Sequence, residues 1–159
     1  MIVALMAKLI LLVCGLAMMA FAADLPTKKW LDLSAIKRMV SAAETEAAKR
    51  GVQVSLCIVD DSGNLLFFQK ADGAGINTIQ FAQKKARYAA LYGKPSKAAQ
   101  DQLKEGNMAV LAFPDGFPNQ GGVPIKVDGR TIGAIAASGA ASEVDEAISQ
   151  AAVDALLKD

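Results

Sequence analysis

The chain has 159 residues, 53% of them hydrophobic, and a formal net charge of +1; it contains no histidine. This composition excludes a disordered chain and a strongly basic nucleic-acid-binding protein, and the length suits a single domain. Without histidine, a Ser-His-Asp triad, a Cys-His dyad and a histidine-based zinc site are excluded as well. The sequence also lacks a P-loop and a dinucleotide-binding fingerprint.

The first 23 residues form an apolar segment whose only charged side chain is Lys8. Its uncharged run is short for a membrane span, which needs about 20 apolar residues, and the run ends in the small-residue pattern A-F-A at positions 20–22. Signal peptidase cleaves after such a pattern, so we expect residues 1–22 to be a signal peptide and residues 23–159 to be one domain, periplasmic or secreted. The alternative is an uncleaved anchor, which would be the chain's one contact with a membrane.

A first helix is predicted over residues 32–50, where apolar side chains recur at helical spacing and Asp32 or Ser34 can cap the start. Two strands follow at residues 52–60 and 65–71. They flank the turn sequence D-S-G-N, which predicts an antiparallel hairpin.

Three polar or reactive side chains of this hairpin have a simple interpretation. Cys57 lies on an apolar strand without a basic neighbour, so we interpret it as a buried apolar residue rather than a reactive thiol. Asp60 and Asp61 end the strand, where carboxylates are most simply solvated turn formers. A catalytic or metal-binding role for the two carboxylates is the alternative.

Two further helices are predicted over residues 78–92 and 96–106, with Ser96 as a cap for the second of them. The stretch at 108–122 predicts either a short strand or a turn of helix, followed by a loop rich in proline and glycine. Strands at residues 123–127 and 130–138 flank the hairpin signal D-G.

The last helix is predicted to begin at Ser142, where S-E-V-D resembles a capping box. The expected order is therefore α-β-β-α-α-β-β-α, an α+β fold with a mainly antiparallel sheet flanked by helices on both faces. The strand at 130–138 is apolar on both faces and belongs in the middle of that sheet. Its glycines and alanines allow either close helix packing or room for a ligand.

Four stretches together resemble the GlcG/HbpS-like family, the haem-degrading-domain family. They are VDDSGNLLFFQKADGA, KARYAALYGKPS, GGVPIKVDGRTIGAIAASGA and SEVDEA, and the resemblance extends over about residues 31–157. It implies a profilin-like α-β-α sandwich, homo-oligomers from dimers to octamers, and an association with haem or related tetrapyrroles. Binding of a small molecule is what the varied members of the family share.

The absence of histidine removes the commonest axial ligand of haem iron. The remaining candidates stand in no ligand motif; they are Tyr88, Tyr92, Met108, Cys57 and the lysines. Haem is kept as a candidate ligand, and we expect no metal site formed by the protein alone.

The predicted binding site combines glycines, which allow a ligand to approach the backbone closely, with cations for a carboxylate or propionate. The resemblance favours Lys85 and Arg87, which match the family's K-A-R segment. At helical steps of about 100°, Lys84 and Arg87 share one side of the helix and Lys85 points apart from Lys84; the alternative is a solvated cationic face. The candidate ligand-binding residues are Asp72, Gly73, Lys85, Arg87, Gly121, Gly122, Val123 and Pro124; no catalytic residue is predicted.

Three functions fit the sequence. The leading prediction is an exported small-molecule-binding protein, not a nucleic-acid-binding one, whose ligand is haem, a related tetrapyrrole or another anionic organic compound. The second is an enzyme that degrades or modifies this ligand, with the cofactor supplying the chemistry. The third is an oligomeric interaction module without a ligand, in which the glycine-rich strand serves packing alone.

Overall fold

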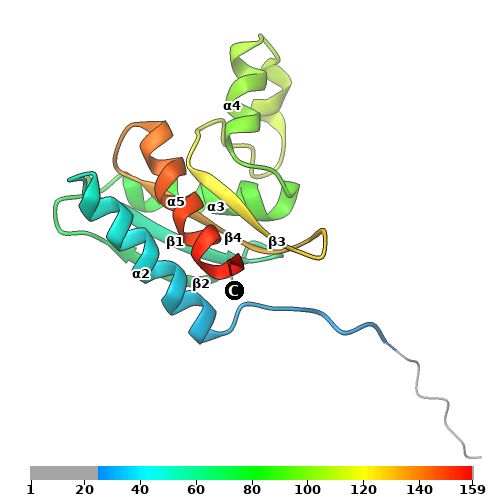
Figure 1. The fold of residues 1–159 in the computed structure, drawn as a ribbon. Coiled ribbons are helices and arrows are strands. Elements are labelled where there is room, and N and C mark those ends of the chain that lie inside the picture. Colours follow the sequence, from blue (N-terminus) through cyan, green and yellow to red (C-terminus); the bar gives the residue numbers. More distant parts are fainter. Residues whose placement is uncertain (1–24, 159) are drawn as a thin grey trace, which may run out of the picture.

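The computed structural model describes residues 25–158, and the expected signal peptide, residues 1–22, lies outside this part of the chain. The order of elements is the predicted α-β-β-α-α-β-β-α (Figure 1). The elements are α2 (Leu33–Lys49), β1 (Ser55–Asp60), β2 (Leu65–Lys70), α3 (Thr78–Tyr92), α4 (Lys97–Lys104), the 3₁₀ helix η1 (Met108–Ala112), β3 (Gly122–Val127), β4 (Arg130–Ser138) and α5 (Ser142–Leu157). The stretch that the sequence left undecided thus contains η1 and a loop that leads into β3.

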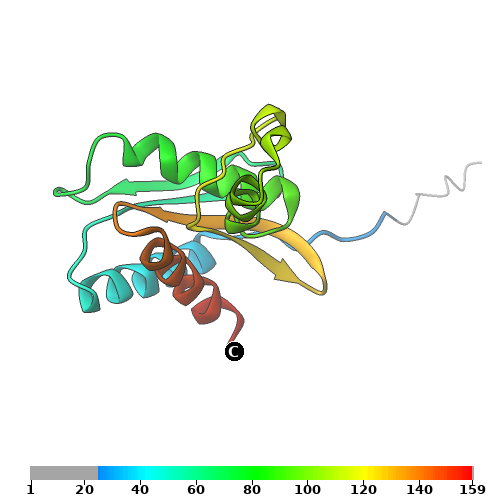
Figure 2. The ribbon, with the colours of Figure 1, turned by 90° about the horizontal axis from the view of Figure 1, so that it is seen from above.

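The four strands form one antiparallel sheet in the order β2-β1-β4-β3. Helices cover both faces: α3 lies on one side of the sheet, and α2 and α5 lie on the other (Figure 2). The predicted α+β fold is confirmed. β4 has a hydrogen-bonded strand on each side, as its apolar sequence on both faces indicates.

The two faces of β4 pack against different helices. Ile135 and Ala137 belong to the larger core beneath α2 and α5, whereas Ala134 and Ala136 belong to a core shared with α3. The helix contributes only small side chains to that second core: Ala82, Ala86, Ala89 and Ala90. Because the side chains on α3 and on this face of β4 are small, α3 lies close to the sheet. The alanines of β4 therefore serve close packing here.

Two β-bulges interrupt the ladders of the sheet. Between β1 and β2 the pairing slips by one residue after Ile58, which leaves Leu66 as an extra residue on β2. Between β3 and β4 it slips after Ile125, which leaves Ile132 as an extra residue on β4. Side chains along a regular strand alternate between the two faces of the sheet. A bulge interrupts this alternation and so changes the direction of the side chain of the extra residue.

The helix caps follow the sequence only in part. Asp32 caps α2, since its carboxylate accepts a 2.7 Å hydrogen bond from the backbone N–H of Ala35. The capping-box prediction for Ser142 was wrong: Ala141 is the residue that precedes α5, and it makes no side-chain capping bond. The acidic residue of the motif, Asp145, turns inward: one of its oxygens accepts from Lys85 and the other from the N–H of Ala140, which replaces the expected reciprocal bond to Ser142.

Ser96 precedes α4, as predicted, but its hydroxyl makes no capping bond. It donates to the carbonyl oxygen of Asn119 and accepts from the backbone N–H of Gly122, which ties the start of α4 to the start of β3. The predicted capping role was wrong because tertiary partners compete for the same hydroxyl group.

α4 and η1 form an arm that projects from the rest of the domain (Figure 1). Val110 of η1 and Tyr88 of α3 belong to one small apolar cluster, which joins the arm to α3. Three large apolar side chains remain exposed around η1: Met108, Leu111 and Phe113. Within residues 25–158, no helix combines the length and the apolar character that crossing a bilayer requires.

Candidate functional site

Lys85, a predicted ligand-binding residue, is bound inside the protein. Its ammonium group lies 2.8 Å from a carboxylate oxygen of Asp145 and 3.2 Å from the carbonyl oxygen of Ala137, and both charged side chains are buried. Burial lowers the pKa of Lys85, while the charge and hydrogen bond of Asp145 oppose this fall. Since Lys85 belongs to α3 and Asp145 to α5, the pair joins the two helical layers across the sheet.

The two predicted glycines make room for this crossing. A Cβ atom on Gly121 would lie 2.8 Å from the ammonium nitrogen of Lys85, and one on Gly122 would overlap the backbone carbonyl of the same residue. Gly121 also has a φ of +135°, which side-chain-bearing residues rarely adopt. The close approach that the glycines permit is therefore an approach to α3 of the same chain.

The turn and strand residues of the predicted site have separate surroundings. Asp72 and Gly73 lie between β2 and α3, where the N–H of Gly73 donates to the side chain of Gln53. Val123 points into the core beneath α2 and α5, and Pro124 is half-buried on the edge strand β3. Their part in ligand binding stays a prediction.

Arg87, the second predicted cation, does not share the surroundings of Lys85. Its guanidinium group binds Asp115 through two hydrogen bonds of 2.9 and 3.1 Å, and donates a third, of 2.8 Å, to the carbonyl oxygen of Gly63. The bond to Asp115 raises the pKa of Arg87, and the bond to Arg87 lowers the pKa of Asp115. The structure thus brings Lys85 together with the two glycines but not with Arg87.

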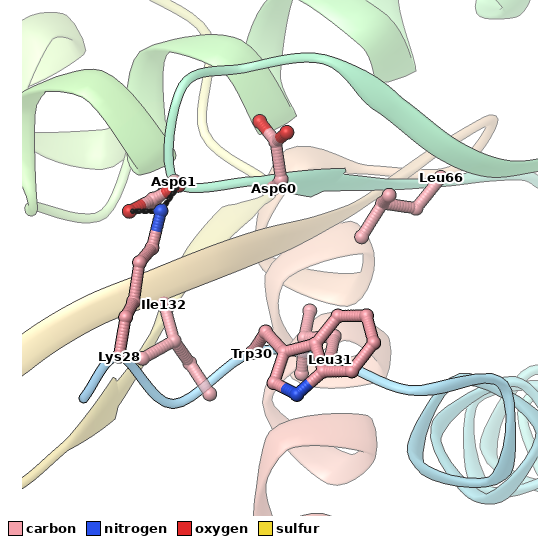
Figure 3. A pocket seen from close by; sticks show the side chains of 7 residues that line it. All are labelled: Lys28, Trp30, Leu31, Asp60, Asp61, Leu66 and Ile132. Atoms are coloured by element: carbon pink, nitrogen blue, oxygen red, sulfur yellow. Dashed lines mark hydrogen bonds and ion pairs between the residues drawn. The ribbon is translucent and has the colours of Figure 1, made fainter.

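A cavity of about 420 Å³ lies where the segment before α2 crosses the sheet (Figure 3). We call it the Trp30 cavity; its lining residues are Lys28, Trp30, Leu31, Asp60, Asp61, Leu66 and Ile132. Both bulged residues of the sheet are among them, and Figure 3 shows the side chains of Leu66 and Ile132 directed toward the space beside Trp30. The bulges therefore direct apolar side chains from two strands that are not neighbours into one cavity.

Leu31 and Trp30 have opposite environments although they are adjacent in the chain. Leu31 is buried in the core, and a Cβ atom on Gly133 would lie 2.7 Å from its Cδ1 atom, so the glycine makes room for it. Trp30 is 79% exposed and is the one tryptophan of the sequence. An exposed tryptophan beside apolar residues is typical of a binding surface.

Two ion pairs connect this segment to the two hairpin turns. Lys28 pairs with Asp61 of the β1–β2 turn at 2.6 Å, and Lys29 pairs with Asp128 of the β3–β4 turn at 2.8 Å. Exposed pairs of this kind contribute little to the stability of a protein, because solvent screens the two charges. The ammonium group of Lys28 can therefore exchange Asp61 for the carboxylate of a ligand at low cost.

The carboxylate of Asp60 points away from Trp30 (Figure 3). It accepts hydrogen bonds of 2.9 Å from the N–H of Ser62, 2.8 Å from the N–H of Asn64 and 3.0 Å from the amide side chain of Asn64. Burial acts to raise the pKa of Asp60, but the bonds from Asn64 and Ser62 outweigh it and the pKa is lowered. These bonds confirm Asp60 as a turn former. Across residues 25–158, no three acidic, cysteine or histidine side chains are grouped as a metal ion requires.

The Trp30 cavity suits the ring of a tetrapyrrole and not its iron. Trp30, Leu66 and Ile132 offer apolar surface to a flat ring, and Lys28 offers a cation to a carboxylate. Among the lining side chains Lys28 alone carries a nitrogen that could ligate iron, and its ammonium is paired with Asp61.

The other axial-ligand candidates of the sequence lie elsewhere. Cys57 is fully buried, and burial raises the pKa of its thiol to about 12. The Tyr92 hydroxyl donates to the carbonyl oxygen of Pro114 at 2.6 Å, Tyr88 is buried beside the arm, and Met108 lies on the arm itself. None of them lines the Trp30 cavity.

Sequence reasoning missed this cavity. Its residues come from the segment before α2, the β1–β2 hairpin and β4, and the two bulges that shape it are not visible in a strand's alternation. One signal was available: the sole tryptophan lies between the expected cleavage site and the first helix, where no packing role is predicted for it.

Fold and cavity together define a small α+β domain with an apolar, cation-edged site. The model of the family described as "Haem degrading protein HbpS-like" matches residues 31–154, and the chain belongs to this family. It is 33% identical over 112 residues to protein GlcG of Escherichia coli, an alignment that covers 70% of this chain and 84% of GlcG. The resemblance to the GlcG/HbpS-like family is confirmed.

Solved structures agree. A crystal structure of HbpS matches with a TM-score of 0.77 at 29% identity, covering 87% of this chain and 97% of HbpS. A structure of a PduOC–haem complex matches with a TM-score of 0.73 at 24% identity, covering 80% of this chain and 95% of PduOC, which shows that the fold is shared.

Proposed function

We propose that this chain is an exported small-molecule-binding protein whose Trp30 cavity binds a flat, anionic organic compound, with a tetrapyrrole as the best candidate. The observation that carries the proposal is the exposed Trp30 ring beside the bulged residues Leu66 and Ile132, with Lys28 at the edge. Aromatic and apolar faces bind flat rings, and an ammonium group pairs with a carboxylate. Support also comes from the family name, which refers to haem degradation, and from PduOC, a protein of the same fold crystallised with haem.

Because Trp30 is the one tryptophan, its fluorescence should report binding directly. We expect haemin and protoporphyrin IX, added to the purified protein, to quench this fluorescence. Trp30→Ala should weaken the affinity for both, measured by absorbance, by about tenfold, equivalent to ~1.4 kcal/mol. Ile76→Ala removes another large, exposed apolar side chain, outside the cavity and outside α3, and is the matched control. Unchanged affinity in the Trp30 variant would exclude this cavity as the site.

The metal-free compound separates ring binding from iron ligation. Lys28 is paired with Asp61, and the carboxylate of Asp60 is bound within its own turn, so we expect no lining residue to ligate iron strongly. Protoporphyrin IX and haemin should then bind with affinities within about threefold of each other, a difference of ~0.7 kcal/mol. Much tighter binding of haemin would show that an axial ligand outside the Trp30 cavity holds the iron.

The role of Lys28 predicts a dependence on ligand charge. Lys28→Gln should weaken binding of protoporphyrin IX and leave binding of its uncharged dimethyl ester unchanged, because only the free acid can replace Asp61. Lys37→Gln, a change of the same type on α2, is the control. Equal effects on acid and ester would contradict pairing between Lys28 and the ligand.

Export rests on the A-F-A pattern that ends the apolar segment. N-terminal sequencing of periplasmic or secreted protein should give Ala23 as the first residue; recovery of full-length protein from membranes alone would contradict export. The homo-oligomer that the resemblance implies also stays a prediction, which sedimentation velocity of the same preparation would test.

A further inference from the structure

The outer side of α3 is covered by a loop that presents an aromatic ring and a carboxylate to it. We call residues 113–117, which follow η1, the Asp115 loop. The ring of Phe117 lies 5.3 Å from that of Phe81, measured between centroids, and the ammonium nitrogen of Lys84 lies 5.5 Å from the centre of the Phe117 ring. The ring of Phe117 thus contacts both an aromatic side chain and a cation of α3.

The carboxylate of this loop is bound one turn further along α3. Asp115 accepts two hydrogen bonds from the guanidinium group of Arg87, of 2.9 and 3.1 Å, in the bidentate geometry that selects carboxylates. The third bond of the group, to the carbonyl oxygen of Gly63, does not involve the loop. This bond can hold Arg87 in place when Asp115 is absent, with the two N–H groups that bind Asp115 then open to a ligand carboxylate.

We infer that α3 carries a second binding site, for an aromatic carboxylate, and that the Asp115 loop is its built-in, displaceable occupant. Phe117 takes the place of the ligand's ring and Asp115 the place of its carboxylate. The site lies on the helix formed by residues 78–92, whereas the Trp30 cavity is formed by the segment before α2 and the sheet, so the inference does not depend on the proposed function.

Helix geometry gives the size of the ligand. Phe81, Lys84 and Arg87 follow one another at intervals of three residues, so they line one side of the helix over about 9 Å at 1.5 Å per residue. A fused two-ring carboxylate such as 2-naphthoate has the length to place its rings near Phe81 and its carboxylate at Arg87.

The loop is held by few contacts, which makes displacement feasible. Apart from Phe117 and the pair with Arg87, the Tyr92 hydroxyl donates to the carbonyl oxygen of Pro114. Phe113, Pro114 and Asp115 are exposed and Phe117 is half-buried, so Phe117 is the main apolar surface that returns to water when the loop leaves. Asp115 also has a φ of +55°, a backbone conformation that residues other than glycine rarely adopt.

The test compares binding of 2-naphthoate to the parent protein and to the double variant Asp115→Ala/Phe117→Ala, by calorimetry. A tethered occupant competes at a high effective concentration, so its removal should tighten binding at least about tenfold. Adding Arg87→Gln to the double variant should reverse this gain about tenfold or more, as expected for a charge-assisted hydrogen bond. Binding of uncharged 2-naphthamide should not respond to Arg87→Gln.

Arg130→Gln in the same double variant removes a cation outside α3 and should leave 2-naphthoate binding unchanged. The inference is overturned when the double variant, folded by circular dichroism, binds 2-naphthoate no more tightly than the parent, or when its binding is indifferent to Arg87→Gln. If the double variant does not fold, the parent protein is titrated with 2-naphthoate and followed by NMR. We expect the Gly116 amide and the Arg87 Nε–H resonances to shift, and the absence of both shifts overturns the inference.

Discussion

The ammonium group of Lys85 and the carboxylate of Asp145 meet at 2.8 Å, and both side chains are buried between the two helical layers. A second oxygen of Asp145 accepts a 3.0 Å hydrogen bond from the N–H of Ala140, just before α5. Two buried charges are tolerated only where each has a partner. The pair itself adds little net stability, but removal of one partner destabilises the protein strongly.

Removal of one partner should therefore be costly. Lys85→Met leaves Asp145 as an uncompensated buried charge, and we expect the free energy of unfolding to fall by about 3–5 kcal/mol in chemical denaturation. The double variant Lys85→Met/Asp145→Asn should lose less than the single one, because asparagine is neutral and still accepts the bond from Ala140. Lys37→Met, on the exposed side of α2, should change stability by less than about 0.5 kcal/mol. A double variant as unstable as the single one would show that the pair is not energetically coupled.

Gly122 is a second position where the structure changes an expectation. The sequence predicts that Gly122→Val blocks a ligand site and leaves the fold largely intact. Because a Cβ atom would overlap the carbonyl oxygen of Lys85, we expect even Gly122→Ala to destabilise the protein by about 1–3 kcal/mol, as overpacking does. At Gly73 an added Cβ meets only the end of the flexible Gln53 side chain, so Gly73→Ala should cost less. Similar midpoints for both variants in urea would contradict this.

Ala136 tests the close packing between β4 and α3. It is fully buried against the alanines of the helix, so Ala136→Leu should lower the free energy of unfolding by about 1–3 kcal/mol through overpacking. Thermal unfolding followed by circular dichroism measures the effect. An unchanged transition would show that a space exists there which the larger side chain can fill.

Cys57 should be chemically silent in the folded protein. Burial raises the pKa of its thiol to about 12, so well below that pH the thiol stays protonated and the nucleophilic thiolate is scarce. In a protein that begins at Ala23, where Cys57 is the one cysteine, we expect no reaction with Ellman's reagent at pH 8 in buffer and one equivalent of reaction in urea. Rapid reaction of the folded protein would mean that β1 opens readily.

The order of elements and the antiparallel hairpins could be predicted from the sequence because they depend on local patterns. The D-S-G-N and D-G turns, the helical spacing of apolar side chains and the two-sided apolar strand at 130–138 each specify structure within a few residues. The caps were less predictable. Asp32 acts locally, whereas the Ser96 hydroxyl and the Asp145 carboxylate bind groups from other elements.

The candidate site was predicted only in fragments. Lys85 and the glycines at 121–122 do lie together, as expected, but as parts of one packing arrangement. Arg87 was correctly placed on the same side of its helix as Lys84, because a helix sets the direction of its side chains by spacing alone. The spacing did not predict which group each of these cations binds.

The sequence by itself determined the fold class, the family and the side of the helix on which each cation stands, since all three follow from periodicity, turn chemistry and motif order. Only the tertiary structure decided that Lys85 pairs with Asp145, a residue 60 positions away, and that Leu66 and Ile132 line one cavity with Trp30. The physical reason is that buried charges and bulged residues are placed by their neighbours in space. A one-residue slip in pairing redirects a side chain, and nothing in the alternation of the strand records where the slip occurs.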